Sequence, residues 1–332
     1  MCESGLLMSY SYDMQTLGKL AKMPARFAVA LHGLKREREE VGNLTFLFPQ
    51  LIEGGKFHSK LFLLKFRDCL RVVVTSANLT QCDWEEILQV IWLQDFTKGA
   101  GDFRFGAELA WFISEVTGSL GFDIETELGI DLDIYDFEPA EGDLLVSIPG
   151  FERHPEACGL GSIRQFLKGH SYTQFLYQAS SIGSLAGKSL KAFRQAFTNN
   201  PQSISSVIYP SQNCVEASRY GVDGAGQFYL RPGTLDPEVA FQEVSVLHPG
   251  YLSHSKTLLI WDGEVNDDSV VYLGSHNLTI SAWGPRIQNY EVGVVFGPRT
   301  DSAQWKKHVL AQLPVNMLDR TKHSSQPFYR SY

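Results

Sequence analysis

The sequence predicts an α/β fold made of two similar halves that share one site at their junction. Strand-like and helix-like segments alternate along the 332 residues, as is typical of α/β proteins. The chain also contains an internal repeat. An HSK triplet occurs at residues 58–60 and again at 254–256, and each copy is followed about twenty residues later by SxNLT and then a Trp. Two copies this far apart indicate duplicated halves and not a solenoid.

The expected elements of the first half follow from local composition. Strands are predicted where β-branched and aromatic residues gather, at residues 25–33, 56–66 and 70–80. The polar residues 35–43 are expected to form a turn or a helix, and residues 107–117 have helical spacing.

A change of composition marks the expected boundary between the halves. Nine acidic residues and no basic ones lie between Asp123 and Asp143, which is typical of a solvated connector. We therefore place the boundary near Gly142, with an N-terminal half at 1–142 and a C-terminal half at 143–332. In the second half, strands are expected at 143–150 and 206–211, and helices at 161–170 and 189–197.

Composition excludes several classes of protein. No apolar run approaches the roughly 20 residues of a membrane span, and the first residues lack the pattern of a signal peptide. We therefore expect a soluble, unsecreted protein. The five cysteines form no CxxC pair, which argues against a zinc site or a disulfide framework. The net charge of −8 leaves no basic footprint for nucleic acid, although a few lysines that converge in a cleft can hold a phosphate.

The two HSK triplets have the residue types that phosphoryl transfer needs. Residues i and i+2 of a strand face the same side, so His58 is expected to point with Lys60, and His254 with Lys256. If the two halves meet about a pseudo-two-fold axis, both pairs converge on one point. Imidazoles can then serve as nucleophile and proton donor, while the ammonium groups and the amides of Asn78 and Asn277 stabilise phosphate oxygens.

The paired HxK motifs, each with a downstream Ser-x-Asn, resemble those of the phospholipase D superfamily. That superfamily usually has four further residues and then an Asp, and here Lys65 and Trp261 occupy the position of that Asp. Because this Asp is absent from both copies, and because of the sequence at residues 70–92, 275–284 and 289–296, the chain resembles the tyrosyl-DNA phosphodiesterase 1 family. The resemblance runs over most of the chain. It implies a phospholipase D-like pseudo-dimer of two α-β-α halves with one active site at their interface.

The resemblance also implies a role for individual residues. His58 is the expected nucleophile, and His254 is the expected acid and then base. Lys60, Lys256, Asn78 and Asn277 are expected to hold the phosphate. Gln89 and Glu291 match the residues that orient the imidazoles, although a simple offset from Asn277 would select Gln288 instead of Glu291. The expected DNA contacts are Tyr10, Ser180, Ser181 and Ser184.

The implied activity is hydrolysis of 3′-phosphotyrosyl and related 3′ adducts of DNA through a covalent phosphohistidine. The implied partners are single- and double-stranded DNA 3′ ends that carry a topoisomerase I peptide, with no membrane partner. The protein is also expected to be a monomer in the nucleus, with some of it in the cytoplasm. Neither a metal nor a cofactor is expected. The alternatives are another phospholipase D-type nuclease or phospholipase, and a non-catalytic DNA-end-binding module.

Other features of the sequence favour structural explanations. Gly54 stands where the family often has an aromatic residue, so stacking of a base there is in doubt. The segment 183–189 is one residue short of a P-loop, so a phosphate cradle is not expected. His32 and His276 are expected to be packed histidines of the core.

Overall fold

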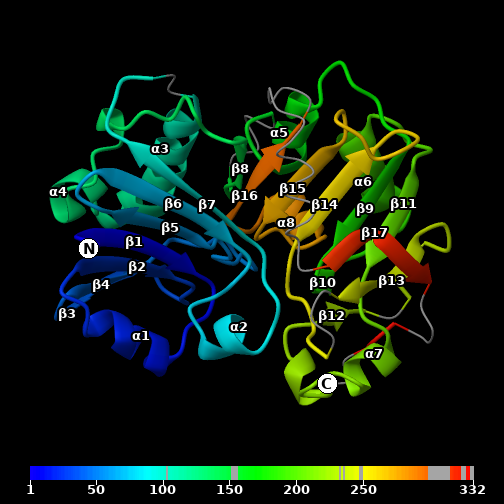
Figure 1. Cartoon of the computed structure of the whole chain (residues 1–332), viewed down its shortest axis with the longest axis horizontal. Coiled ribbons are helices and arrows are strands. Elements are labelled where there is room, and N and C mark those ends of the chain that lie inside the picture. The colour runs from blue at the N-terminus through cyan, green and yellow to red at the C-terminus, as the bar shows by residue number, and fades with distance from the viewer. Residues whose placement is uncertain are drawn as a thin grey trace.

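Two β-sheets lie side by side in the computed structural model, one from each half of the chain (Figure 1). The structure describes residues 1–101, 104–150, 156–231, 233–234, 236–246, 250–297, 315–322 and 327–329. Within this part of the chain one sheet has seven strands and the other has eight, and a small third sheet pairs β10 (Ser181–Ile182) with β12 (Tyr229–Leu230).

The first sheet has the strand order β3-β4-β2-β1-β5-β6-β7. Its strands are β1 (Ser4–Ser9), β2 (Arg26–Leu31), β3 (Glu37–Val41), β4 (Leu44–Phe48), β5 (Leu61–Lys65), β6 (Cys69–Thr75) and β7 (Ile91–Thr97). The strands β4, β2 and β1 are parallel, while β5, β6 and β7 continue the sheet antiparallel.

The second sheet has the order β17-β13-β11-β9-β14-β15-β16-β8. Its strands are β8 (Asp143–Ser147), β9 (Gln174–Gln178), β11 (Ile204–Ile208), β13 (Ala240–Val246), β14 (Thr257–Trp261), β15 (Val270–Gly274), β16 (Glu291–Phe296) and β17 (Val315–Lys322). The strands β13, β11 and β9 are parallel, and β14, β15 and β16 follow antiparallel. This repeats the pattern β4-β2-β1-β5-β6-β7, so the duplication seen in the sequence is a duplication of topology.

Buried side chains fill three layers around the two sheets. The strands alternate their apolar residues between faces, as period-2 patterning requires. One core covers the face of the first sheet that packs on α1 (Met14–Ala21), through residues such as Leu17, Val29 and Phe62. A second lies between the other sheet and the helices α5 (Gly159–Phe166) and α6 (Gly187–Thr198).

The third core lies between the two halves. It contains Leu63 and Val74 of the first sheet and Leu259 and Val292 of the second. The helix α3 (Arg104–Thr117) contributes several buried residues to the same cluster, including Phe112. Because one continuous core joins both sheets, apolar burial holds the halves in a fixed relation, and a site at their junction is stabilised with them.

Two predictions made from the sequence are wrong, one for residues 35–43 and one for residues 123–143. Residues 35–43 include the strand β3, which is an edge strand paired only with β4. An edge strand tolerates charged residues, which is why its polar composition suggested a turn or helix. The acidic stretch from Asp123 to Asp143 is also no solvated connector, because α4 (Ile124–Leu128) and the buried Tyr135 and Phe137 within it belong to the central core.

The other predicted segments have the expected structure. The predicted strands at 25–33, 56–66, 70–80, 143–150 and 206–211 overlap β2, β5, β6, β8 and β11, and the three predicted helices appear as α3, α5 and α6. The predicted boundary near Gly142 immediately precedes β8, the first strand of the second sheet in chain order. A division into two domains there stays a prediction.

No helix in the described ranges is long and apolar enough to cross a bilayer.

Candidate active site

Each HSK triplet is held by a segment from the other half of the chain. The triplets lie immediately before β5 and β14. The His58 backbone N–H donates to the Tyr290 carbonyl at 3.0 Å, next to β16, and the His254 N–H donates to the Leu88 carbonyl at 2.8 Å, next to β7. The backbone of each motif histidine is therefore held by a hydrogen bond to the other half of the chain.

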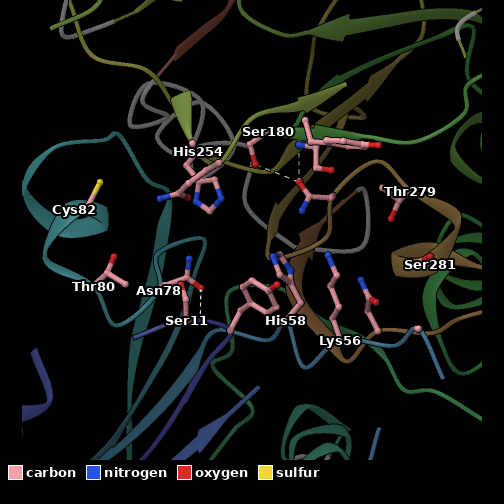
Figure 2. A pocket seen from close by; sticks show the side chains of 18 residues that line it. Ser11, Lys56, His58, Asn78, Thr80, Cys82, Ser180, His254, Thr279 and Ser281 are labelled. Carbon is pink, nitrogen blue, oxygen red and sulfur yellow. Dashed lines mark hydrogen bonds between the residues drawn. The ribbon is translucent and has the colours of Figure 1, made fainter. Parts of the chain in front are cut away.

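Both motif histidines line one cavity of about 890 Å³ (Figure 2). Besides these imidazoles, the described residues of the cavity wall carry hydroxyl groups, amides and one ammonium group, and none of them carries a carboxylate. The wall consists of Tyr10, Ser11, Gly54, Lys56, His58, Asn78, Thr80, Cys82, Ser180, Ser181, Gly226, Gln227, Tyr229, His254, Asn277, Thr279, Ser281 and Asn289. In a chain with a net charge of −8, a wall without acidic groups favours an anionic ligand.

The imidazole of His58 is oriented by Glu291. Its Nδ1 lies 2.8 Å from the Glu291 carboxylate, which also accepts hydrogen bonds from Ser275 Oγ at 2.6 Å and from Asn289 Nδ2 at 3.0 Å. Because an ionised carboxylate only accepts hydrogen bonds, Nδ1 carries the proton and Nε2 keeps a free lone pair. His58 therefore has the tautomer that a nucleophile needs.

His254 has the matching arrangement with a neutral partner. Its Nδ1 lies 3.3 Å from Gln89 Oε1, which also accepts a hydrogen bond from Ser76 Oγ at 2.7 Å. The buried carboxylate of Asp83 lies 3.9 Å from the same Nδ1. The two halves thus build the same Ser–acceptor–His chain, with an amide behind one imidazole and a carboxylate behind the other.

Lys60 and Lys256 lie beneath the cavity and are fully buried. Each ammonium group donates to the carbonyl of the histidine in its own motif, His58 O at 2.6 Å for Lys60 and His254 O for Lys256. Burial lowers the pKa of Lys60 to about 7, and burial together with the Lys60 charge lowers the pKa of Lys256 well below its usual value. An anion in the cavity would favour the charged form of both lysines.

Burial also decides the charge of the other groups in the site. Desolvation, followed by the nearby lysines, lowers the pKa of His58 and of His254 well below the usual value. Desolvation raises the pKa of Glu291. The free cavity therefore holds neutral imidazoles at neutral pH, as nucleophilic attack by His58 requires.

The two asparagines are oriented in the same way in both halves. Asn78 Oδ1 accepts the Ser11 backbone N–H at 3.4 Å, and Asn277 Oδ1 accepts the Ser181 N–H at 3.0 Å. Both residues line the cavity. With each oxygen held by the backbone, the amide N–H groups are available as donors, although one Asn78 Nδ2–H is directed to Asp83 at 2.8 Å.

The predicted DNA contacts are only partly brought together. Tyr10, Ser180 and Ser181 line the cavity, and the Tyr10 ring lies 5.3 Å from the His58 ring. Ser184 is exposed outside the cavity wall, with its hydroxyl 3.5 Å from the Thr234 carbonyl. A DNA contact by Ser184 stays a prediction that this geometry does not support.

His32 and His276, which the sequence predicts to be packed in the core, differ from one another. His276 is fully buried, contacts Ser147 Oγ at 3.0 Å and packs on Trp283 at 4.4 Å, so its expected packing role is confirmed. His32 is only half-buried and accepts the Phe57 N–H at 3.2 Å. It lies 5.0 Å from the Tyr10 ring, so it supports the site and is not a core residue.

Several residues of the site have no role that was predicted from the sequence. Lys56 and Asn289 lie two residues before His58 and Glu291, a spacing that places side chains on one face of an extended segment and could have revealed them. Asp83 accepts hydrogen bonds from both the backbone N–H and the side-chain amide of Asn78. Gln227, which donates to Asp83 at 2.5 Å, lies in a loop without any local signal.

Replacing Glu291 tests the orientation of His58. We expect Glu291→Gln to fold normally and to lose about tenfold in single-turnover rate, because Gln89 already shows that an amide oxygen can accept from both a serine and an imidazole. We expect Glu291→Ala to lose about a hundredfold and to lower the melting temperature, because it leaves the buried Ser275 and His58 donors without an acceptor. Equal rates for both variants and the wild type would contradict an orienting role.

Comparison with known proteins agrees with this geometry. The sequence profile of the family described as tyrosyl-DNA phosphodiesterase matches residues 3–328. The chain is 26% identical to tyrosyl-DNA phosphodiesterase 1 of Arabidopsis thaliana, over 89% of this chain and 57% of the relative. It is 27% identical to the Drosophila melanogaster protein of the same name, over 76% of this chain and 54% of the relative. The chain thus spans a little over half the length of these relatives.

The fold is also shared with a solved structure. The crystal structure of the yeast tyrosyl-DNA phosphodiesterase superposes with a TM-score of 0.72 at 16% identity, over 99% of this chain and 89% of that chain. This confirms the α/β pseudo-dimer of the phospholipase D type that the resemblance implied. The profile match covers nearly the whole sequence, so the chain belongs to the tyrosyl-DNA phosphodiesterase family.

Proposed function

We propose that this chain hydrolyses 3′-phosphotyrosyl bonds and related 3′ adducts of DNA, as a repair enzyme. The observation that carries the proposal is the pair of imidazoles on one cavity, each with its Nδ1 held by a side chain from the other half. Displacement at phosphorus requires a nucleophile and a proton donor for the leaving oxygen. Two imidazoles with fixed tautomers meet both needs.

In the first step, His58 Nε2 attacks phosphorus while the P–O bond to the tyrosyl oxygen breaks. The bound anionic phosphate favours the protonated imidazolium of His254. The leaving oxygen takes the Nε2 proton of this imidazolium, which gives a free tyrosine side chain, a neutral His254 and a phosphohistidine on His58. The Glu291 carboxylate behind His58 stabilises the positive charge that the imidazole gains, and neutral Gln89 behind His254 leaves that imidazole free to give up its proton. This difference in direct hydrogen-bond partners supports the two roles, and the Asp83 carboxylate 3.9 Å from His254 Nδ1 favours the protonated form that the first step needs.

In the second step, water attacks the phosphohistidine and gives its proton to His254. The P–N bond breaks, His58 returns to its neutral form, and DNA leaves with a 3′ phosphate. Lys60, Lys256, Asn78 and Asn277 stabilise the phosphate oxygens in both steps. The bound phosphate in turn restores the lysine charges that burial disfavours in the free site.

A gel assay on an oligonucleotide with a 3′-phosphotyrosine tests this proposal. We expect conversion to the 3′-phosphate oligonucleotide, with an unchanged rate in EDTA, because buried ammonium groups supply the charge stabilisation for which other phosphodiesterases use metal ions. Loss of turnover on chelation would contradict the metal-independent mechanism. Hydrolysis of phosphatidylcholine, with none of the oligonucleotide, would favour the phospholipase alternative instead.

The remaining expectations about partners belong to this proposal. It includes action on both single- and double-stranded 3′ ends that carry a topoisomerase I peptide, as a monomer in the nucleus. Light scattering of the purified chain and fractionation of cells that express it would test the last two.

A further inference from the structure

Lys56 differs from every other residue on the cavity wall. Among the described residues that line the cavity it is the only lysine or arginine, and its side chain is exposed at the mouth. In the part of the chain that the structure describes, no carboxylate lies within ion-pair distance of it. Its ammonium nitrogen lies 5.7 Å from the centroid of the Tyr10 ring, and, after burial, its charge contributes to lowering the pKa of His32 and of His58. Three N–H donors thus face the cavity mouth.

The backbone at Lys56 is fixed relative to the reacting centre. Its carbonyl accepts the Tyr290 N–H at 2.9 Å, and the next residue but one is His58, whose N–H donates to Tyr290 O. Two residues of chain span at most about 7 Å, so the ammonium group stays within a side chain's reach of the phosphorus on His58. Figure 2 shows Lys56 beside His58, on the side of the cavity that carries Thr279 and Ser281.

The reacting phosphate already has its own cations. Lys60 and Lys256 are buried below the imidazoles, and each is fixed by a hydrogen bond to a motif carbonyl. Lys56 is exposed and has no such bond, so it suits a second anion nearer the solvent. In a nucleic-acid strand the next anion is the phosphodiester one nucleotide upstream. Phosphate contacts of this kind position a strand without reading its sequence.

We propose that Lys56 binds the phosphodiester one nucleotide upstream of the scissile phosphate, and so makes the enzyme prefer strands over mononucleoside esters. The inference rests on the proposed function, because it takes the scissile phosphate to lie on His58. Lys56 is therefore a specificity-determining residue, with the phosphate of a DNA strand as its ligand.

Two chromogenic esters that differ by one nucleotide test the inference. They are thymidine 3′-(4-nitrophenyl phosphate) and the 3′-(4-nitrophenyl phosphate) of the dinucleotide TpT. For the wild type we expect kcat/KM to be about tenfold higher for the dinucleotide, mostly through KM, since a charge-assisted hydrogen bond contributes this much. In Lys56→Gln this ratio should fall to about one, and Lys56→Arg should restore most of it.

Lys188→Gln is the matched control, because it removes the same charge from an exposed residue of α6 that does not line the cavity. It should keep the wild-type ratio. A wild-type ratio near one, or an unchanged ratio in Lys56→Gln, would overturn the inference. An equal loss on both esters would do so too, because it would place Lys56 on the reacting phosphate.

Binding separates this inference from the proposed function. The affinity of a fluorescent single strand with a 3′ phosphate can be measured by anisotropy at several salt concentrations. Lys56→Gln should reduce the slope of log affinity against log salt by about 0.7, the value for one phosphate contact on a single strand. If the wild type hydrolyses neither ester but Lys56→Gln still reduces the slope, the proposed reaction is wrong and the phosphate contact stands. An unchanged slope refutes the contact.

Discussion

His58→Ala is expected to reduce turnover of a 3′-phosphotyrosyl oligonucleotide on the order of 10⁴-fold or more, as removal of a nucleophile does in other covalent enzymes. The loss should be this large because no other described group on the cavity wall can replace it. His254 is held in its own position by the hydrogen bond to Gln89. Burial and neighbouring acids raise the pKa of the Cys82 thiol to about 11, so it is not a thiolate at neutral pH. Single-turnover kinetics on a denaturing gel would measure the effect.

The control for His58→Ala is His32→Ala, which removes a second imidazole near Tyr10 that does not line the cavity. We expect it to lose far less activity. Binding of the 3′-phosphate product should persist in His58→Ala, since the lysines and asparagines remain. Substantial turnover by His58→Ala, or an adduct that still forms in it, would remove His58 from the role of nucleophile.

His254→Asn is expected to accumulate a covalent protein–DNA adduct while steady-state turnover falls about 10³-fold. Tyrosine, with a pKa of about 10, leaves with only modest help from a proton donor, so the first step survives the substitution in part. Attack by water needs a base at His254, so release of the DNA is slowed most. The adduct would migrate above the free oligonucleotide on a denaturing gel.

The 4-nitrophenyl ester sharpens this test, because its phenol is more acidic than tyrosine and needs still less protonation. His254→Asn should then give a burst of nitrophenol close to one equivalent, followed by slow turnover. The double variant with His58→Ala is the control and should give no burst. A single variant that still turns over the ester with neither burst nor adduct would contradict the prediction that loss of His254 slows the second step most.

Some assignments were already fixed by the residues themselves. The repeated HSK and SxNLT patterns identified His58, His254, Asn78 and Asn277, which all line one cavity, because both copies carry the same residue types at matching spacing. The β-branched and aromatic residues around the first motif predicted strands that are present as β5 and β6. The choice between Glu291 and Gln288 depended on resemblance. In the structure Gln288 binds Ser281 at 2.9 Å, whereas Glu291 lies beside His58.

Other assignments could not be made locally. The acidic stretch after Asp123 appeared solvated because its charges are numerous, but the residues between the charges pack into the central core. Trp84 and Trp283 occupy the same position of the repeat, yet one is 46% exposed and the other is fully buried. A duplicated motif does not reveal which of its two copies the rest of the fold covers.

By itself, the sequence determined the chemistry of this protein: two imidazoles, two ammonium groups and two amides in a duplicated α/β frame. Only the tertiary structure decided how these groups become a site. Each histidine is oriented by a residue from the other half, over 160 positions away in the chain. Such pairings depend on how two sheets pack across a shared core, and packing is set by the whole set of buried side chains and not by any local pattern.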